Sequence, residues 1–237
     1  MDIKESDILG ADIGRHWYYR SKGAGVRRLL GKQHFDCILD IGAGSGYFSR
    51  SLLRAGLATS ALCVDPNYDS ESDESEGARP LRFRRNPDSQ NRSDLLLLMD
   101  VLEHVDDDGA LLRESLAHAS PGALVLISVP AFNFMWSGHD EFLGHRRRYT
   151  LSELESLAGA EGLQVIKGCY FFGFLLPIAY LTRKFSARAR EMTPKSDLRR
   201  HHWLVNAILA AICSMELMIM RKNRIGGLTA FCLARAR

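Results

Sequence analysis

The chain has 237 residues, of which 46% are hydrophobic and 25% are charged, a composition typical of an ordinary folded protein. This length suffices for one sizeable α/β domain with an insertion, and the net charge of +3 is too small to indicate nucleic acid as a partner. Five scattered cysteines without metal-ligand spacing indicate buried free thiols in a reducing compartment. Because the first residues lack the apolar core of a signal peptide, we expect a cytoplasmic protein.

Apolar runs and helical patterns alternate through the first half of the chain. A helix pair is predicted over residues 7–31, and it ends at Gly31. The acidic, Ser-rich stretch 67–79 lacks hydrophobic periodicity and is predicted to be an exposed, mobile loop. The predicted strands cover about 36–41, 60–65, 81–84, 94–99 and 123–129, and the predicted helices cover about 46–56 and 107–119. This alternation favours a doubly wound parallel sheet.

After Pro130 the pattern changes to a long loop over residues 131–149, rich in polar and aromatic groups. A helix then begins near Thr150, with Thr150 or Ser152 as its N-cap. Two more strands are predicted at 163–167 and 228–233. The residues between them, roughly 172–222, would form an insertion.

The insertion is apolar and basic. Its two apolar runs cover 169–181 and 203–220. Cations lie between and after these runs: Arg183, Lys184, Arg188, Arg190, Lys195, Arg199, Arg200, Arg221, Lys222 and Arg224. The first run is too short to span a bilayer, and Glu216 would be costly at membrane depth in the second. Such helices suit a membrane interface or an acyl-binding lid, and the alternative is packing on the sheet or on a second subunit.

A glycine-rich turn stands out at residues 36–47. An apolar run ends in Asp40 and leads directly into glycines at positions 42, 44 and 46, where the backbone can turn sharply and approach a ligand. Dinucleotide dehydrogenases use a related turn, so the motif alone indicates only a nucleotide-binding strand–turn–helix. Asp65 ends the second apolar run at the spacing of an acid that binds ribose hydroxyls.

A third block, residues 94–105, together with the glycine turn and Asp65, resembles class I S-adenosylmethionine-dependent methyltransferases, and dehydrogenases lack it. The resemblance implies S-adenosylmethionine (SAM) as cofactor and a Rossmann-like, doubly wound α/β sheet of seven strands. The last strand would be antiparallel, with the helical insertion between strands six and seven. The implied domains are a helical cap over 1–31, a SAM-binding core over 32–171 and 223–237, and the insertion over 172–222. The implied cofactor-binding residues are Asp40, Gly42, Ala43, Gly44, Asp65, Asp100, Val101 and Leu102.

The stretch Asp100–His104 is also similar to one in ubiquinone-pathway O-methyltransferases, where corresponding positions have been linked to a divalent metal. Glu103 and His104 could share a cation, since carboxylate and imidazole are both metal ligands. The same stretch occurs in many methyltransferases that use no metal, where it orders the loop. We therefore predict no metal.

Residues 128–149 resemble a group of bacterial methyltransferases that share the pattern VPA…W…HD…GH.RRY, and residues 16–20 also match that group. His139 with Asp140, or His145, could act as a general base, because imidazole changes protonation near neutrality and a carboxylate can orient it. Arg147 and Arg148 could hold an anionic acceptor group. The alternative is a structural loop whose His and Arg side chains bond to backbone carbonyls. Trp17 and Trp136 are predicted to be walls of the substrate pocket.

Three functions follow as hypotheses. The leading one is methyl transfer to a hydrophobic or lipid-linked acceptor by a protein held peripherally on an anionic membrane surface, at the cytoplasmic face. The second is a soluble methyltransferase for a small metabolite, with the insertion as a lid or a homodimer interface. The third is a SAM-binding regulator without catalysis, against which the intact glycine turn and the polar loop at 137–149 argue.

Overall fold

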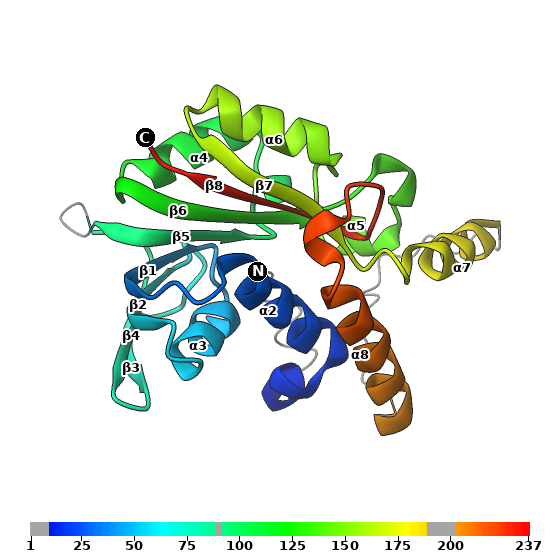
Figure 1. Cartoon of the computed structure of the whole chain (residues 1–237), viewed down its shortest axis with the longest axis horizontal. Helices are drawn as coiled ribbons and strands as arrows, with labels where there is room; N and C mark the ends of the chain where they lie inside the picture. Colours follow the sequence, from blue (N-terminus) through cyan, green and yellow to red (C-terminus); the bar gives the residue numbers. More distant parts are fainter. Residues whose placement is uncertain (1–9, 89–91, 189–201) are drawn as a thin grey trace.

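The computed structural model describes residues 10–88, 92–188 and 202–237. Its centre is an eight-stranded sheet in the order β3-β4-β2-β1-β5-β6-β8-β7 (Figure 1). The strands are β1 (Phe35–Ile41), β2 (Ala58–Val64), β3 (Ser72–Glu76), β4 (Arg79–Arg84), β5 (Ser93–Met99), β6 (Ala119–Pro130), β7 (Gln164–Phe171) and β8 (Thr229–Arg235). Strands β4, β2, β1, β5 and β6 run parallel, whereas β8 is antiparallel to both β6 and β7. The predicted α/β class with an antiparallel last strand is confirmed.

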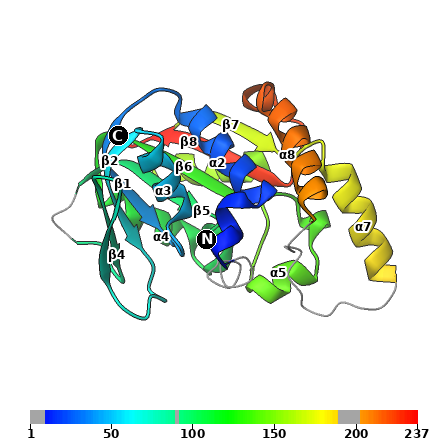
Figure 2. The same ribbon diagram turned by 90° about the horizontal axis from the view of Figure 1, so that it is seen from below.

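Helices cover both faces of the sheet. On one face lie α2 (Trp17–Leu30), preceded by the short helix η1 (Gly10–Arg15), and α3 (Tyr47–Arg54); Figure 2 shows α2 and α3 in front of the strands. On the other face lie α4 (Asp108–Leu116) and α6 (Leu151–Ala160). Residues 95–98 of β5 are fully buried because a parallel sheet covered on both sides needs apolar side chains in both directions. The helix pair predicted before Gly31 is present, and Gly31 caps α2 with φ 71°.

The acidic stretch at 67–79 is not a loop throughout, and that prediction was wrong. Residues 72–76 form β3, an added edge strand that pairs antiparallel with β4 and raises the strand count from the predicted seven to eight. All but the last of its side chains are exposed, so its carboxylates stay in water. Three of them pair with arginines of α3 and β4: Glu74 with Arg50, Glu76 with Arg54, and Asp73 with Arg84. An exposed edge strand without apolar side chains has no hydrophobic periodicity from which it could be predicted.

Among the described residues, the helices between β7 and β8 are α7 (Leu176–Arg188), α8 (Trp203–Leu217) and the short η4 (Met220–Lys222), where the sequence predicts a helical insertion. The side chain of Asn206 fixes α8 to α2, because it accepts from the backbone N of Trp17 (2.7 Å) and donates to the carbonyl of Arg15 (3.0 Å). Glu216 is buried and accepts from the backbone N of Gly173 at 2.6 Å. In both ribbon views α7 lies at the outside of the molecule, beyond α8 (Figures 1 and 2).

Part of the insertion's basic run, at 189–201, lies outside the described residues, as do residues 1–9 of the predicted cap. Among the helices that the structure describes, none has the length and apolar character required to cross a membrane.

Candidate active site

The predicted site residues meet at one edge of the sheet, where the parallel strands end. The glycine turn follows β1, Asp65 follows β2, Asp100 follows β5, and the loop 131–149 follows β6. The register brings the ends of β1, β2 and β5 level, since Ile41 pairs with both Val64 and Leu98. The carboxyl edge of a doubly wound sheet is where ligands bind.

The glycine turn is tight enough to require glycine at two positions. Gly42 has φ 64°, and a Cβ there would lie 2.7 Å from a methyl carbon of Val101. Gly46 has φ 67°, and a Cβ there would lie 3.1 Å from the sulfur of Cys63. The amides of Gly42 and Ala43 donate to the carbonyl of Val64 at 2.7 and 3.2 Å, which ties the turn to the end of β2.

Asp65 is buried and its carboxylate bridges two loops. Oδ2 accepts from the backbone N of Gly44 at 3.2 Å, and Oδ1 accepts from the backbone N of Asn67 at 3.0 Å. The hydroxyl of Tyr68, which the sequence analysis did not single out, donates to the carbonyl of Gly44 at 2.6 Å. The acid predicted to bind ribose thus lies beside the glycine turn.

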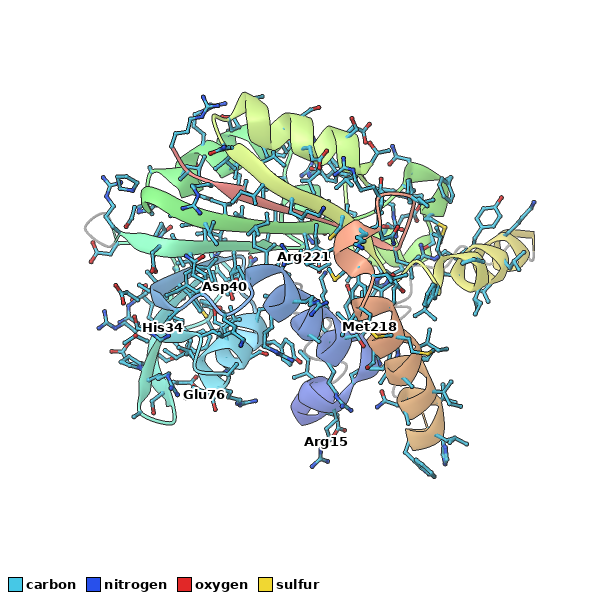
Figure 3. All side chains as sticks on the ribbon, in the orientation of Figure 1. Arg15, His34, Asp40, Glu76, Met218 and Arg221 are labelled. Atoms are coloured by element: carbon cyan, nitrogen blue, oxygen red, sulfur yellow. The ribbon has the colours of Figure 1, made fainter. Side chains whose placement is uncertain are left out.

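Asp40 lies at the end of β1, inside the protein (Figure 3). Its Oδ2 accepts from the hydroxyl of Ser49 at 2.7 Å, while Oδ1 is buried and has no hydrogen-bonding partner within the described ranges. Burial, opposed by the Ser49 hydrogen bond, raises the pKa of Asp40 to about 6. A buried acceptor beside the glycine turn is therefore available to a ligand.

Asp100 pairs with a residue that the sequence analysis missed, Lys22 of α2. The Lys22 side chain is fully buried, and its Nζ donates to Asp100 Oδ2 and to the hydroxyl of Tyr18 (3.2 Å). Burial lowers the pKa of Lys22, but Asp100 and Tyr18 outweigh burial and hold it above its usual range. A signal existed in the sequence, because Lys22 falls on the apolar side of α2 with Tyr19 and Val26, three and four residues away.

Val101 and Leu102 connect the cofactor residues to the loop after β6. Val101 packs against Gly42, and Leu102 is buried with its carbonyl accepting from the hydroxyl of Tyr149 at 3.2 Å. Leu102 begins the short helix η2 (Leu102–His104).

The loop after β6 is built around the buried carboxylate of Asp140. It contains η3 (Asn133–Met135) and α5 (Gly138–Leu143), and Ser137 caps α5 in a reciprocal capping box with Asp140. Asp140 Oδ1 lies 2.9 Å from Nδ1 of His145 and 2.7 Å from Nε of Arg148, and Oδ2 accepts from Arg148 Nη2 at 3.0 Å. Burial raises the pKa of Asp140, but the hydrogen bonds from His145 and Arg148 hold it below its usual range. Asp140 therefore orients His145, whose ring centroid lies 6.4 Å from that of His139.

Both predicted anion-binding arginines have protein partners. Arg148 is buried and also donates to the carbonyl of Ala131 at 3.0 Å. Arg147 donates to the Asp108 carboxylate (3.2 Å) and to the carbonyl of Asp106 (2.7 Å). These contacts favour the structural alternative for the two arginines.

The two predicted pocket tryptophans come from separate elements. Trp17 begins α2 and makes an edge contact with Phe172 at 5.8 Å between ring centroids. Trp136 follows η3 and is half-buried, and its backbone N donates to the carbonyl of Asn133 at 3.0 Å.

Glu103, His104 and His145 offer three ligand atoms within 4.8 Å of one another. Glu103 is fully buried, and neither of its carboxylate oxygens has a hydrogen-bonding partner in the part of the chain that the structure describes. Burial and the nearby Asp100 raise the pKa of Glu103 well above its usual range. These side chains could hold a metal ion, and the expectation of no metal stays a prediction.

The fold and the glycine turn define a doubly wound α/β protein that binds a nucleoside at the carboxyl edge of its sheet. Comparison with known proteins narrows this class. Residues 15–167 match the family described as a methyltransferase domain, and the chain belongs to that family.

Relatives by sequence are methyltransferases of mycobacteria. The chain is 30% identical over 142 residues to an uncharacterized methyltransferase of Mycobacterium tuberculosis, covering 54% of this chain and 56% of that one. It is 29% identical over 113 residues to an uncharacterized methyltransferase of Mycobacterium marinum, covering 46% and 44%. The chain thus spans about half the length of the curated relatives that it matches.

Solved structures share the fold. A Haloferax volcanii methyltransferase, in complex with the Trm112 methyltransferase activator, has a TM-score of 0.60 at 18% identity, covering 100% of this chain and 98% of that one. A SAM-dependent methyltransferase of Archaeoglobus fulgidus has a TM-score of 0.54 at 16% identity, covering 98% and 97%. A Haemonchus contortus phosphoethanolamine N-methyltransferase in complex with SAM has a TM-score of 0.54 at 14% identity, covering 100% and 60%.

The family match confirms the predicted class, a methyltransferase domain, and the solved structures share its fold. The residues at the sheet edge fit SAM. The glycines of the turn allow close approach, Asp65 is an acid beside that turn, and Asp40 Oδ1 is a buried acceptor without a hydrogen-bonding partner among the described residues. Such acceptors suit the hydroxyl and ammonium groups of the cofactor.

Proposed function

We propose that this protein transfers the methyl group of SAM to a hydrophobic or lipid-linked acceptor while held peripherally at an anionic membrane surface. The observation that carries the proposal is an exposed apolar surface beside the loop that follows β6. We call this the acceptor surface. It comprises the exposed side chains of Phe134, Phe174, Ile178, Tyr180, Leu181, Trp203, Leu204, Val205, Ile208, Met215, Met218 and Ile219.

Several side chains of the acceptor surface are strongly exposed. Ile178 on α7 is 59% exposed, and Trp203 and Met218, at the two ends of α8, are each 71% exposed. Met218 is labelled in Figure 3, where many side chains of α7 and α8 project outward from the body of the protein. Clusters of exposed apolar side chains are typical of sites that meet a membrane or another protein.

Contacts join the acceptor surface to the candidate catalytic loop. Arg183 of α7 donates a hydrogen bond to the carbonyl of Met135. Phe134 contacts Tyr180 of α7 edge to face at 5.8 Å and stacks on Phe132 at 5.1 Å. The apolar side chains of α7 thus continue into the loop that carries His145.

Cations near this surface fit anionic lipid headgroups. Lys184 on α7 is exposed, as are Arg221 and Lys222 of η4 (Met220–Lys222), which follows α8. Arg221 is labelled in Figure 3 close to the end of α8. Each such cation contributes about 1 kcal/mol near an anionic surface, and the attraction decays within a Debye length.

For methyl transfer, the main task of the protein is to align the acceptor with the methyl group of the cofactor. Bound SAM supplies an electrophilic methyl group, and the chain must place the acceptor atom in line with it. Asp140 holds the Nδ1 side of His145. The opposite ring nitrogen of His145 would then take the proton that an oxygen or nitrogen acceptor loses on methylation.

Vesicle binding tests the membrane part of the proposal. We expect the protein to bind anionic vesicles, more weakly as salt rises and less on neutral vesicles. The double variant Ile178→Ser/Leu181→Ser should lose this binding, whereas Ile166→Ser, an exposed apolar residue on β7, should keep it. Equal binding by both variants, or no binding to anionic vesicles at low salt, would contradict the proposal.

A soluble methyltransferase with α7 and α8 as a lid or dimer interface is the second candidate. The bonds of Asn206 to η1 and α2 favour it, since they fix α8 against the protein. Sedimentation velocity separates the two. A concentration-dependent dimer that dissociates in Ile208→Asp, with no vesicle binding, would support the second candidate.

A further inference from the structure

A cleft between two helices lies outside the candidate active site. Helices α2 and α3 lie side by side in both ribbon views (Figures 1 and 2), and together with η1 they border a cleft of about 340 Å³. Small-molecule sites typically have volumes of about 300–1,000 Å³, so the cleft is large enough for a small ligand. None of its lining residues is a predicted cofactor-binding residue. They are Gly14, Arg27, Tyr47, Ser51, Arg54 and Ala55.

The spacing of residues along α3 explains the polar lining of the cleft. Tyr47, Ser51 and Arg54 recur at helical spacing and therefore share one face of α3. That face lies close to α2, since a Cβ at Gly23 would lie 3.4 Å from the Tyr47 ring and 3.6 Å from Ser51 Oγ. Arg27 of α2 reaches the same face, where its Nη1 donates to Ser51 Oγ at 2.5 Å. Two hydroxyls and two guanidinium groups thus border one cleft.

The protein does not balance all of the positive charge in the cleft. Arg54 donates to both carboxylate oxygens of Glu76, at 2.7 and 2.9 Å, and so has a counter-charge. Arg27 is half-buried, and no carboxylate in the described part of the chain forms an ion pair with it. Burial raises the pKa of the Tyr47 hydroxyl, and the charges that oppose this rise are all guanidinium groups, those of Arg27, Arg20 and Arg54. These like charges repel one another, and an anion bound among them would relieve the repulsion.

We propose that the cleft is a binding site for a small organic phosphate, with the Arg27 guanidinium and the hydroxyls of Tyr47 and Ser51 holding the phosphate. A guanidinium group presents parallel N–H donors that match the oxygens of a phosphate. Ser51 Oγ accepts from Arg27, and its own proton can still be donated to a ligand. A phosphate group alone fills only part of 340 Å³, so the ligand has an organic part, which the ring of Tyr47 would contact. This inference does not depend on the proposed transfer reaction.

Calorimetry on the unmodified protein tests the site with inorganic pyrophosphate, ribose 5-phosphate and ribose as probes. We expect the two phosphates to bind and uncharged ribose not to bind. Ribose 5-phosphate should bind equally well when S-adenosylhomocysteine is present at saturation, because the cleft shares no residue with the predicted cofactor site. Competition between these two ligands would place the phosphate at the sheet edge and overturn the proposal. Absence of binding by both phosphates would also overturn it.

Matched variants test the assignment of the phosphate to Arg27. Arg27→Gln should weaken ribose 5-phosphate by at least about 10-fold, because charge-assisted hydrogen bonds are lost. Arg28→Gln removes the same charge from the next, exposed position of α2 and should leave the affinity within about 3-fold. Equal affinity in these two variants would overturn the proposal. Should Arg27→Gln not fold, Tyr47→Phe, which keeps the ring and removes the hydroxyl, still decides, since it should weaken binding by about 3-fold or more.

Discussion

The cofactor edge (the glycine turn with Asp65 and Asp100) and the acceptor surface differ in how their side chains are satisfied. At the cofactor edge the carboxylates are held by partners inside the protein, such as Gly44 for Asp65 and Lys22 for Asp100. On the acceptor surface, large apolar side chains of α7 and α8 face solvent. The residues matched by the family end at 167, before both helices. The family match therefore includes the cofactor edge and the loop after β6, but neither α7 nor α8.

The loop after β6 joins the two regions, and its centre gives the largest expected effect. Asp140→Ala would leave the buried guanidinium of Arg148 without its carboxylate. We expect the free energy of unfolding to fall by about 3–5 kcal/mol, measured by urea denaturation. Asp106→Ala removes an exposed partner of Arg146 and should have a far smaller effect. Comparable losses in both variants would show that Asp140 does not organise the loop.

A variant of His145 distinguishes an effect on methyl transfer from an effect on cofactor binding. Because Asp140 orients His145, we expect His145→Ala to lower turnover by about 100-fold or more, with SAM affinity nearly intact. His139→Ala should lower turnover less. Turnover on the true acceptor, with SAM binding measured in parallel, checks both. Wild-type turnover in both variants would show that the loop has a structural role only. A larger loss of turnover in His139→Ala than in His145→Ala would identify His139 as the general base.

Asp65 tests the cofactor edge alone. We expect Asp65→Ala to weaken SAM binding by about 1.5–3 kcal/mol, the usual loss with charge-assisted hydrogen bonds. The exposed Asp69 gives the control Asp69→Ala, which should bind SAM normally. Calorimetry that finds unchanged affinity in Asp65→Ala would remove Asp65 from the site, and tighter binding of NAD than of SAM would contradict the proposed function.

Asp40 gives the smallest effect, a pH dependence of stability. Its pKa is about 6 in the folded protein and 3.8 without burial, so between these values the folded state keeps a proton that the unfolded chain has lost. The contribution of the Asp40 proton to the free energy of unfolding is therefore fully present below about pH 4 and is lost as the pH rises to 6. Over this pH range the free energy of unfolding of the wild type should fall by about 2 kcal/mol relative to that of Asp40→Asn. Parallel pH dependence in both proteins would contradict the burial of an ionisable Asp40.

Local sequence determined the sheet and the cofactor edge. The short run Leu95–Leu98 is typical of a strand buried on both faces, and the glycines at 42 and 46 adopt backbone conformations that favour glycine. Asp65 follows its strand directly, so its place at the edge follows from strand order. These features depend on neighbours in the chain, and for that reason they could be predicted.

Tertiary structure alone decided the partners of charged side chains. Asp140 lies next to His139 in sequence, yet its carboxylate binds His145 and Arg148, because α5 turns it inward. Lys22 meets Asp100 across 78 residues, and carboxylates of β3 meet arginines of α3 and β4. An ion pair depends on distance in space, which no periodicity records. The exposure of α7 is likewise a property of packing, since an apolar run looks the same whether it is buried or faces water.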